Sequence, residues 1–176
     1  MNYQEELKLV SLEFPDFKIV PKTSSKMMTY ISKFLRFITF GCNTNFDSFI
    51  TTIKNTMYVP NGWEEKPDFD KYVILCHETI HLRQAKKYSF VLFAFLYVFM
   101  PIPLGFAWFR ASFEMEAYEV QIRLTKAKYG IHHVQSDEFR SFIISQFNSA
   151  NYGWMMPFKS ITDSWYDRVI SDISEE

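Results

Sequence analysis

The sequence predicts a mainly helical α+β domain with a small antiparallel sheet. Only five of the 176 residues are glycine, and the chain contains neither a low-complexity run nor an internal repeat, which favours helices. One short segment, residues 53–60, has the composition of a strand and ends in the turn signal Pro60-Asn61-Gly62. A chain of this length can bury its core as one unit, so residues 1–176 are expected to form a single domain.

The net charge, the cysteine spacing and the first residues indicate which partners and which cellular location to expect. The net charge of −1 gives no reason to expect a nucleic acid partner. Cys42 and Cys76 have neither the spacing of metal ligands nor that of a disulfide framework. The first residues lack a basic segment followed by an apolar one, so no signal peptide is visible and a cytoplasmic location is expected.

Residues 22–40 combine basic and large apolar side chains at helical spacing. The basic residues are Lys22, Lys26, Lys33 and Arg36, and most of the residues between them are apolar. Two interpretations stay open: an amphipathic helix that packs on the domain with a solvated basic edge, or a helix that binds a membrane surface. The sequence favours packing.

Residues 68–87 contain the most informative motif, His77-Glu78-Thr79-Ile80-His81. An acidic residue, Asp68 or Asp70, can cap a helix whose apolar residues Val73, Cys76 and Ile80 recur at helical spacing. On a helix, residues four apart share one face, so both histidines can bind one metal ion while Glu78 lies beside an open position. The alternative is a helix with two ordinary histidines and a solvated glutamate.

Residues 88–109 contain no charged side chain. The run has the length of a membrane span, but Pro101 and Pro103 interrupt it and leave arms shorter than the ~20 residues that a crossing helix needs. We therefore expect an apolar helical hairpin that turns at residues 101–103. Two interpretations stay open: the hairpin is part of the hydrophobic core, or it makes a peripheral or re-entrant contact with a bilayer.

Residues 110–128 predict a second long helix, with an apolar stripe formed by Phe113, Ala117, Val120 and Leu124. Glu114 and Glu116 flank this stripe on opposite sides, and periodicity does not choose between them. Glu119 can pair with Arg123 at the i+4 position. A catalytic zinc ion takes three protein ligands and keeps one position open, so a glutamate on this helix is the natural third ligand.

Together with the preceding motif, the segment Glu114-Met115-Glu116-Ala117-Tyr118 resembles the gluzincins, in which a His-Glu-x-x-His helix is followed by a helix that supplies a glutamate ligand. It is similar to the Glu-x-Glu-Ala-Asp or Glu-x-Glu-Ala-Asn segment of CAAX-prenyl-protease-like, HtpX-like and ImmA-like peptidases. The first glutamate is the ligand in those families, which implies Glu114 here, with Glu116 as the alternative. Tyr118 departs from their Asp or Asn, a residue that would support a ligating histidine.

The resemblance implies a zincin-like domain in which the apolar hairpin lies between the two metal-binding helices. Peptidases of this class hold substrate as an added strand at a sheet edge, so Tyr58 and Val59 are candidates for lining the cleft. His132, His133 and Tyr152 are candidates for donating a hydrogen bond to the tetrahedral intermediate. The spacing favours none of these three over the others.

We therefore expect a zinc-dependent peptidase that acts on a peptide or protein substrate. His77, His81 and Glu114 would bind Zn²⁺, and Glu78 would be the general base. One alternative is a catalytically silent zincin-fold protein with a binding or structural role, including a role at a membrane. Another is a membrane-anchoring protein in which the five-residue motif is accidental.

Overall fold

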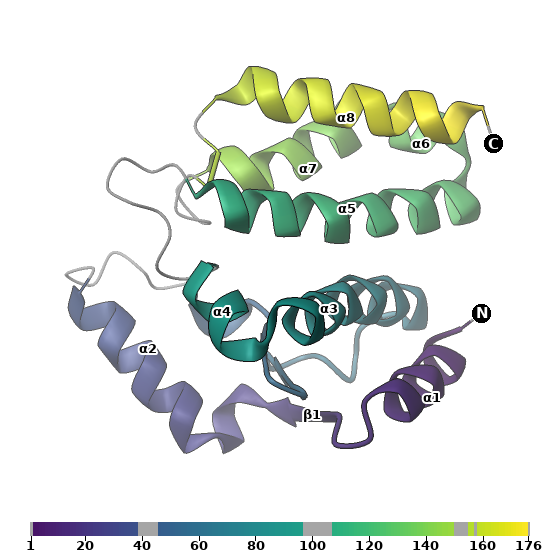
Figure 1. Cartoon of the computed structure of the whole chain (residues 1–176). Coiled ribbons are helices and arrows are strands. Elements are labelled where there is room, and N and C mark those ends of the chain that lie inside the picture. The colour runs from purple at the N-terminus through teal and green to yellow at the C-terminus, as the bar shows by residue number, and fades with distance from the viewer. Residues whose placement is uncertain (1, 39–45, 97–106, 150–154, 157, 176) are drawn as a thin grey trace. The chain divides into compact units, whose positions relative to one another are not determined.

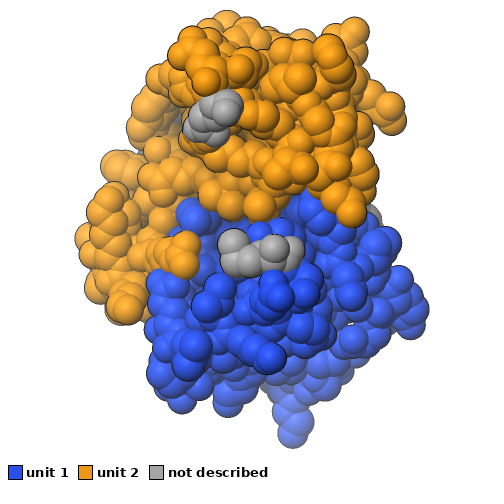
Figure 2. Space-filling model, turned by 90° about the vertical axis from the view of Figure 1, so that its right-hand side faces the viewer, with its two compact units in different colours: residues 1–82 blue, residues 83–176 orange. Residues whose placement is uncertain are grey.

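Helices make up most of the computed structural model, which describes residues 2–38, 46–96, 107–149, 155–156 and 158–175. The predicted fold class, mainly helical α+β with a small sheet, is confirmed. Contacts within the chain define two compact units, residues 1–82 and residues 83–176 (Figure 2). The boundary falls inside one continuous helix. The single domain that the chain length suggests stays a prediction.

The first unit contains a short helix, a three-stranded sheet, an exposed helix and most of the helix that carries the histidines (Figure 1). Its elements are α1 (Tyr3–Glu13), β1 (Lys18–Pro21), the 3₁₀ turn η1 (Lys22–Ser24), α2 (Lys26–Ile38), the 3₁₀ turn η2 (Phe46–Ser48), β2 (Thr51–Ile53), β3 (Thr56–Val59) and α3 (Asp68–Tyr88).

The sheet is mixed, and β3 is its central strand. β2 pairs with β3 in the predicted antiparallel sense, and β1 adds a parallel strand on the other side, so that Ile19 and Thr52 both lie opposite Met57. The segment predicted as one strand, residues 53–60, is instead folded back by a two-residue turn at Lys54 and Asn55. Lys54 has a φ of 51°, the left-handed conformation that tight hairpin turns require.

This strand order corrects the prediction that Tyr58 and Val59 lie on an edge strand. Tyr58 lies opposite both Val20 and Thr51, and Val59 lies opposite Pro21. Among the described strands, β1 and β2 form the two edges of the sheet. β1 pairs with β3 although the two strands are far apart in the sequence. Sequence periodicity predicts a strand but not its place in the sheet.

The histidine helix α3 begins directly after Pro67, with Asp68 and Asp70 in its first turn and lysines in its last. These charges complement the helix dipole at both ends. The predicted apolar stripe faces the core, since Val73 and Cys76 are buried and Ile80 is half-buried. The turn predicted after β3 is also present, and Gly62 has the positive φ of 80° that favours glycine there.

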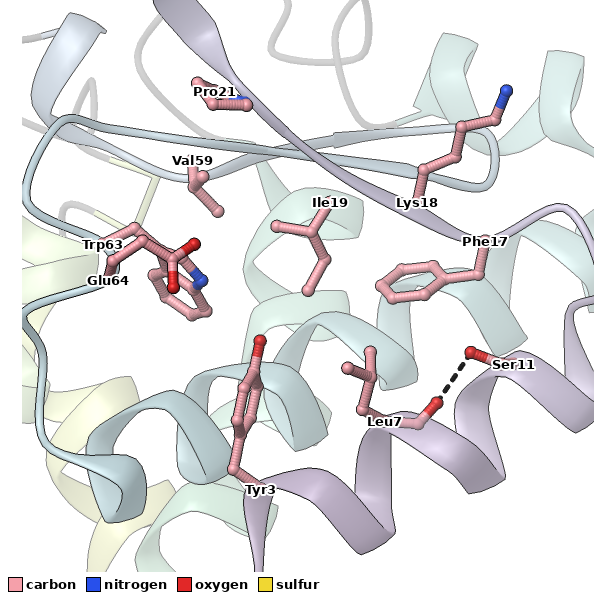
Figure 3. A pocket seen from close by; sticks show the side chains of 10 residues that line it. All are labelled: Tyr3, Leu7, Ser11, Phe17, Lys18, Ile19, Pro21, Val59, Trp63 and Glu64. Carbon is pink, nitrogen blue, oxygen red and sulfur yellow. Dashed lines mark hydrogen bonds between the residues drawn. The ribbon is translucent and has the colours of Figure 1, made fainter.

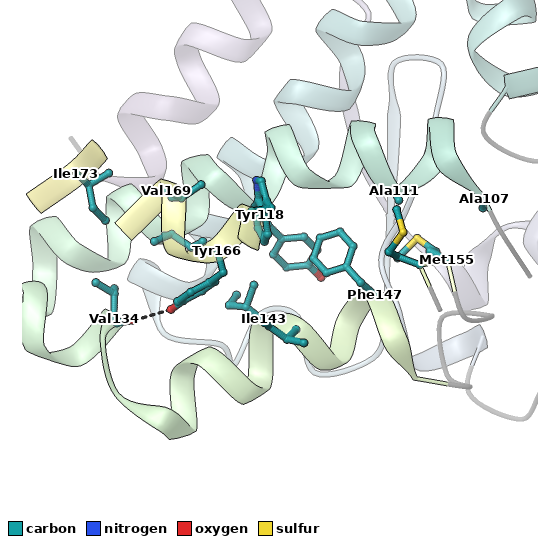
Figure 4. Close-up of a cluster of buried hydrophobic side chains, with 14 residues drawn as sticks. Ala107, Ala111, Tyr118, Val134, Ile143, Phe147, Met155, Tyr166, Val169 and Ile173 are labelled. Carbon is teal, nitrogen blue, oxygen red and sulfur yellow. Dashed lines mark hydrogen bonds between the residues drawn. The ribbon is translucent and has the colours of Figure 1, made fainter. Parts of the chain in front are cut away.

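The second unit is built from helices that enclose one apolar cluster (Figures 1 and 4). Its elements are α4 (Phe90–Ala94), α5 (Trp108–Tyr129), α6 (Ile131–Val134), α7 (Asp137–Asn148) and α8 (Lys159–Ser174). The cluster draws Ile122 from α5, Phe147 from α7 and Tyr166 from α8, each no more than 1% exposed. The predicted ion pair within α5 is confirmed, with Arg123 Nη2 3.0 Å from Glu119 Oε1.

The apolar segment at residues 88–109 is described in part. α4 forms its beginning, and α5 starts at Trp108 near its end. The turn predicted at residues 101–103 lies outside the described residues. Of the helices that the structure describes, none combines the length and the apolar character needed to cross a bilayer.

A hollow with a volume of about 360 Å³ lies between α1 and β1 in the first unit (Figure 3). Tyr3 and Leu7 point into it from α1, toward Ile19 on β1. Its lining includes no residue of the histidine motif. The hollow is therefore separate from the chemistry that the motif predicts.

Tyr166 generates a test of the second unit. Its hydroxyl donates to the backbone oxygen of Val134 at 2.5 Å (Figure 4), and burial raises the pKa of Tyr166 to about 12. We expect Tyr166→Phe to lower the free energy of unfolding by about 1–2 kcal/mol in urea denaturation at pH 7, because a buried acceptor loses its donor. The exposed Tyr30→Phe is the control and should change it by less than about 0.5 kcal/mol.

The difference in the free energy of unfolding between Tyr166→Phe and the wild type should also depend on pH. A folded-state pKa above the ordinary 10.0 means that Tyr166 stabilises the fold fully below pH 10 and loses this contribution as the pH rises toward 12. The two proteins should therefore converge in stability over this range. A difference that stays constant from pH 8 to 12 would contradict the assigned environment of Tyr166.

Candidate metal centre

His77 and His81 lie one turn apart on α3 and face the same side. Their ring centroids are 5.1 Å apart, with an angle of 76° between the ring planes. The exposed fractions of the two side chains are 9% and 8%, so both imidazoles lie in a largely dry environment. The helical spacing of the motif produces this arrangement, as the sequence predicts.

Glu114 lies in the middle of the buried face of α5, whereas Glu116 is exposed. The buried residues of this face recur at intervals of three and four: Ala111, Glu114, Tyr118, Ile122 and Thr125. Glu116 is two residues from Glu114, and two residues turn a helix by about 200°. The structure therefore distinguishes the two glutamates that periodicity leaves equivalent.

Gln84 ties the end of α3 to the start of α5. Its side-chain nitrogen Nε2 donates to the backbone oxygen of Phe113 at 3.1 Å and to Oε2 of Glu116 at 2.7 Å. The ring of Phe113 packs against Tyr88 at the end of α3 and against Phe93 of α4, with centroid distances of 5.5 and 5.2 Å. Gln84 is one helical turn beyond His81, so these contacts hold α5 beside the end of the histidine helix.

His77, His81 and Glu114 form a group that is close enough to bind a metal ion. Each offers one ligand atom, and these atoms all lie within 4.8 Å of one another. For comparison, ligands of a tetrahedral ion at about 2.1 Å lie about 3.4 Å apart. Two imidazole nitrogens and a carboxylate oxygen are donors that hold divalent transition metals.

Lys22 is a charged neighbour of the motif that sequence reasoning missed. It is 4% exposed, and its Nζ donates to the backbone oxygen of Phe46 at 2.6 Å and lies 3.9 Å from the centre of the Phe46 ring. Burial lowers the pKa of Lys22 from 10.5 to about 8, and the carboxylates of Asp47 and Glu78 partly offset this effect. Lys22 thus lies within the electrostatic field of Glu78.

The sequence predicts that Lys22 is part of an amphipathic helix over residues 22–40. α2 begins only at Lys26, and Lys22 belongs to the 3₁₀ turn η1 that follows β1. The turn η1 directly follows β1, and Lys22, its first residue, is buried. No spacing signal connects Lys22 with Glu78, because 56 residues separate them in the sequence.

Tyr118 occupies the position where the gluzincin pattern has Asp or Asn. Its ring packs edge-on against Phe147 of α7 at a centroid distance of 5.4 Å, and its side chain is part of the apolar cluster of the second unit. Tyr118 is therefore a core residue. Its place in the core agrees with the departure from the pattern seen in the sequence.

Of the predicted hydrogen-bond donors, His132 and His133 are not part of this group. His132 and His133 are exposed on α6, beyond the end of α5. Tyr129, at the end of α5, lies 15 residues after Glu114, which is about 22 Å at the helical rise. Tyr152 lies outside the described residues. A catalytic role for these three residues stays a prediction.

Comparisons of this chain with protein-family models, with curated proteins and with solved structures give no match. The motif and the geometry of the group are therefore the features of this chain that indicate a function.

Metal binding can be tested by exchanging the ligands one at a time. We expect wild-type protein to bind about one metal ion per chain, measured by elemental analysis after dialysis against zinc. His77→Ala and Glu114→Gln should lose affinity by more than the roughly 10- to 100-fold typical of a residue that only orients a ligand. Glu116→Gln is the matched control, because it makes the same change on the same helix and keeps an oxygen acceptor for Gln84.

Two results would contradict the assigned group. The first is full metal occupancy in His77→Ala. The second is a loss in Glu116→Gln that equals the loss in Glu114→Gln, since only Glu114 belongs to the group in the structure.

The environment of Lys22 predicts how stability changes with pH. Its pKa is lowered in the folded state, so between about pH 8 and 10.5 the unfolded chain binds one more proton than the folded chain at this site. The contribution of Lys22 to the free energy of unfolding should therefore rise with pH across this window. Lys22→Met should lack this rise, which chemical denaturation at pH 7, 9 and 10.5 would measure as a difference from wild type. Parallel pH profiles for the two proteins would show that Lys22 is solvated.

Proposed function

We propose that this chain is a zinc-dependent peptidase of the gluzincin type. The observation that carries the proposal is the proximity of His77, His81 and Glu114, with Glu78 in the same turn of α3 as the first histidine. The residues come from two helices, and Glu114 follows His81 by 33 residues in the sequence. A glutamate from a second helix, close to both histidines, supports the proposal in addition to the five-residue motif.

The donor set fits zinc. Two histidines and a glutamate with an open fourth position are a known ligand set of catalytic zinc, whereas structural zinc is usually closed by four protein ligands. A zinc ion held by these residues would lower the pKa of its bound water to about 7 and polarise the carbonyl of a peptide bond.

Glu78 supplies the proton transfers that hydrolysis requires. Its half-buried carboxylate follows His77 directly and would accept the proton of the attacking water. The water oxygen forms a bond to the peptide carbon, and the carbon–nitrogen bond then breaks. Glu78 passes its proton to the departing amine, so the carboxylate is restored at the end of the cycle.

A second candidate function is a zinc-bearing binding protein without catalytic activity. The core position of Tyr118 favours it, because no carboxylate or amide at that position orients a ligating histidine. Glu78 favours the peptidase, since a site used only for binding has no need of a general base. The two functions differ in whether the zinc-loaded protein cleaves peptides.

The mechanism predicts that Glu78→Gln keeps the metal and loses hydrolysis. We expect the variant to bind zinc like the wild type and to cleave fluorescein-labelled casein about 10²–10⁴-fold more slowly, because an amide cannot accept the proton. The control is Glu116→Gln, which makes the same substitution on an exposed glutamate and should retain cleavage. Wild-type cleavage rates in Glu78→Gln would refute the mechanism. Stoichiometric zinc without cleavage of peptide substrates by the wild type would favour the binding protein.

A further inference from the structure

The helix α2 presents an apolar stripe to solvent. The exposed fractions of its four outward apolar side chains are 80% for Phe37, 70% for Tyr30, 62% for Phe34 and 41% for Met27. Aromatic and methionine side chains of this size are usually buried, and scattered single exceptions need no explanation. Here the four exceptions occur on one helix of 13 residues.

The four side chains share one face of α2. At 100° per residue they fall within an arc of about 80°. Met28, which is 1% exposed, lies on the other side of the helix and packs into the first unit. α2 is therefore held by one face and leaves its second apolar face in contact with solvent.

Positive charge borders this stripe. Lys26, Lys33 and Arg36 are exposed and lie in the neighbouring arc of about 80°, and residues 26–38 contain no acidic residue. A helix with an apolar face, a cationic edge and an outward tyrosine has the pattern of helices that lie in the interface of a bilayer.

We propose that α2 binds the surface of membranes that contain anionic lipids. The apolar stripe would insert among the acyl chains, and the three cations would contact the negatively charged headgroups. This inference does not rest on the proposed peptidase activity. It adds a membrane contact to the packing that the sequence favours for residues 22–40, because α2 also packs through Met28.

Charge complementarity favours a lipid surface over a second copy of the chain. Two α2 helices paired along their stripes would bring six cations together, and neither copy of α2 contributes an acidic residue to balance them. Like charges at such an interface are unfavourable. An anionic surface instead complements every charge on α2.

The second unit shows the same combination on another helix. In α4 and the residue after it, Val91 is 77%, Phe95 50% and Leu92 47% exposed. Lys86 and Lys87 precede them in the last turn of α3. The segment for which the sequence suggests a bilayer contact thus also places apolar side chains in solvent beside basic ones.

Flotation with lipid vesicles tests the proposal on the full-length protein. We expect the wild type to float with vesicles of phosphatidylcholine and phosphatidylserine, to bind phosphatidylcholine alone more weakly, and to dissociate as the salt concentration rises. The variant Phe34→Ser/Phe37→Ser should bind the anionic vesicles at least about tenfold more weakly, because it removes two of the inserting side chains. Lys33→Glu/Arg36→Glu should weaken binding to the anionic vesicles only.

The matched control is Leu9→Ser/Leu12→Ser on α1, which removes two apolar side chains with exposed fractions of 50% and 79%. It should bind vesicles like the wild type. Circular dichroism should be unchanged in all three variants, since every substituted residue is exposed.

Three results would overturn the proposal. They are no binding of the wild type to anionic vesicles, equal binding of the Phe34/Phe37 variant and the wild type, and equal weakening by the α1 control. A dimer that sedimentation detects in the wild type and not in the Phe34/Phe37 variant, without vesicle binding, would assign the stripe to a second copy of the chain.

Discussion

The candidate metal centre depends on the contact that Gln84 makes between α3 and α5. A single buried side-chain nitrogen donates to the backbone beside Glu114 and to the carboxylate of Glu116. Gln84 is one turn after His81, so the histidines and the residue that contacts α5 belong to the same helix. Packing of Phe113 against Tyr88 and Phe93 strengthens the same contact. Without it, nothing local to the sequence would bring a glutamate 33 residues away to the histidines.

Burial shapes the chemistry that the motif can perform. The three proposed ligands are each less than a tenth exposed, and electrostatic interactions are stronger where water is scarce. Glu78 is more exposed than the histidines that flank it, which suits a group that must exchange protons with a water molecule and a leaving amine. Lys22 adds a partly desolvated positive charge to the electrostatic field around Glu78. Helix α3 thus carries two of the three proposed ligands and the proposed base, α5 carries the third ligand, and the turn η1 carries Lys22.

The first unit contains both Glu78, the proposed general base, and the exposed apolar stripe of α2. Lys22, which interacts electrostatically with Glu78, lies four residues before the start of α2. α2 packs through Met28 and leaves its aromatic stripe in solvent. A protein that binds a bilayer through this helix would hold the turn at Lys22, and with it the neighbourhood of Glu78, close to the lipid surface. Substrates at or near a membrane would then be favoured over substrates in bulk solution.

The features that depend on local geometry can be predicted from the sequence. The pairing of His77 with His81, the two long helices and the ion pair of Glu119 with Arg123 all follow from residues three or four apart, and helical periodicity expresses such relations directly. Four features became visible only in the folded chain: Glu114 rather than Glu116 belongs to the group with His77 and His81, β3 is the central strand, Lys22 is buried, and the stripe of α2 is exposed. Periodicity indicates which residues share one face of a helix or strand. Contacts between segments far apart in the chain decide what packs against that face, and no local pattern encodes these contacts.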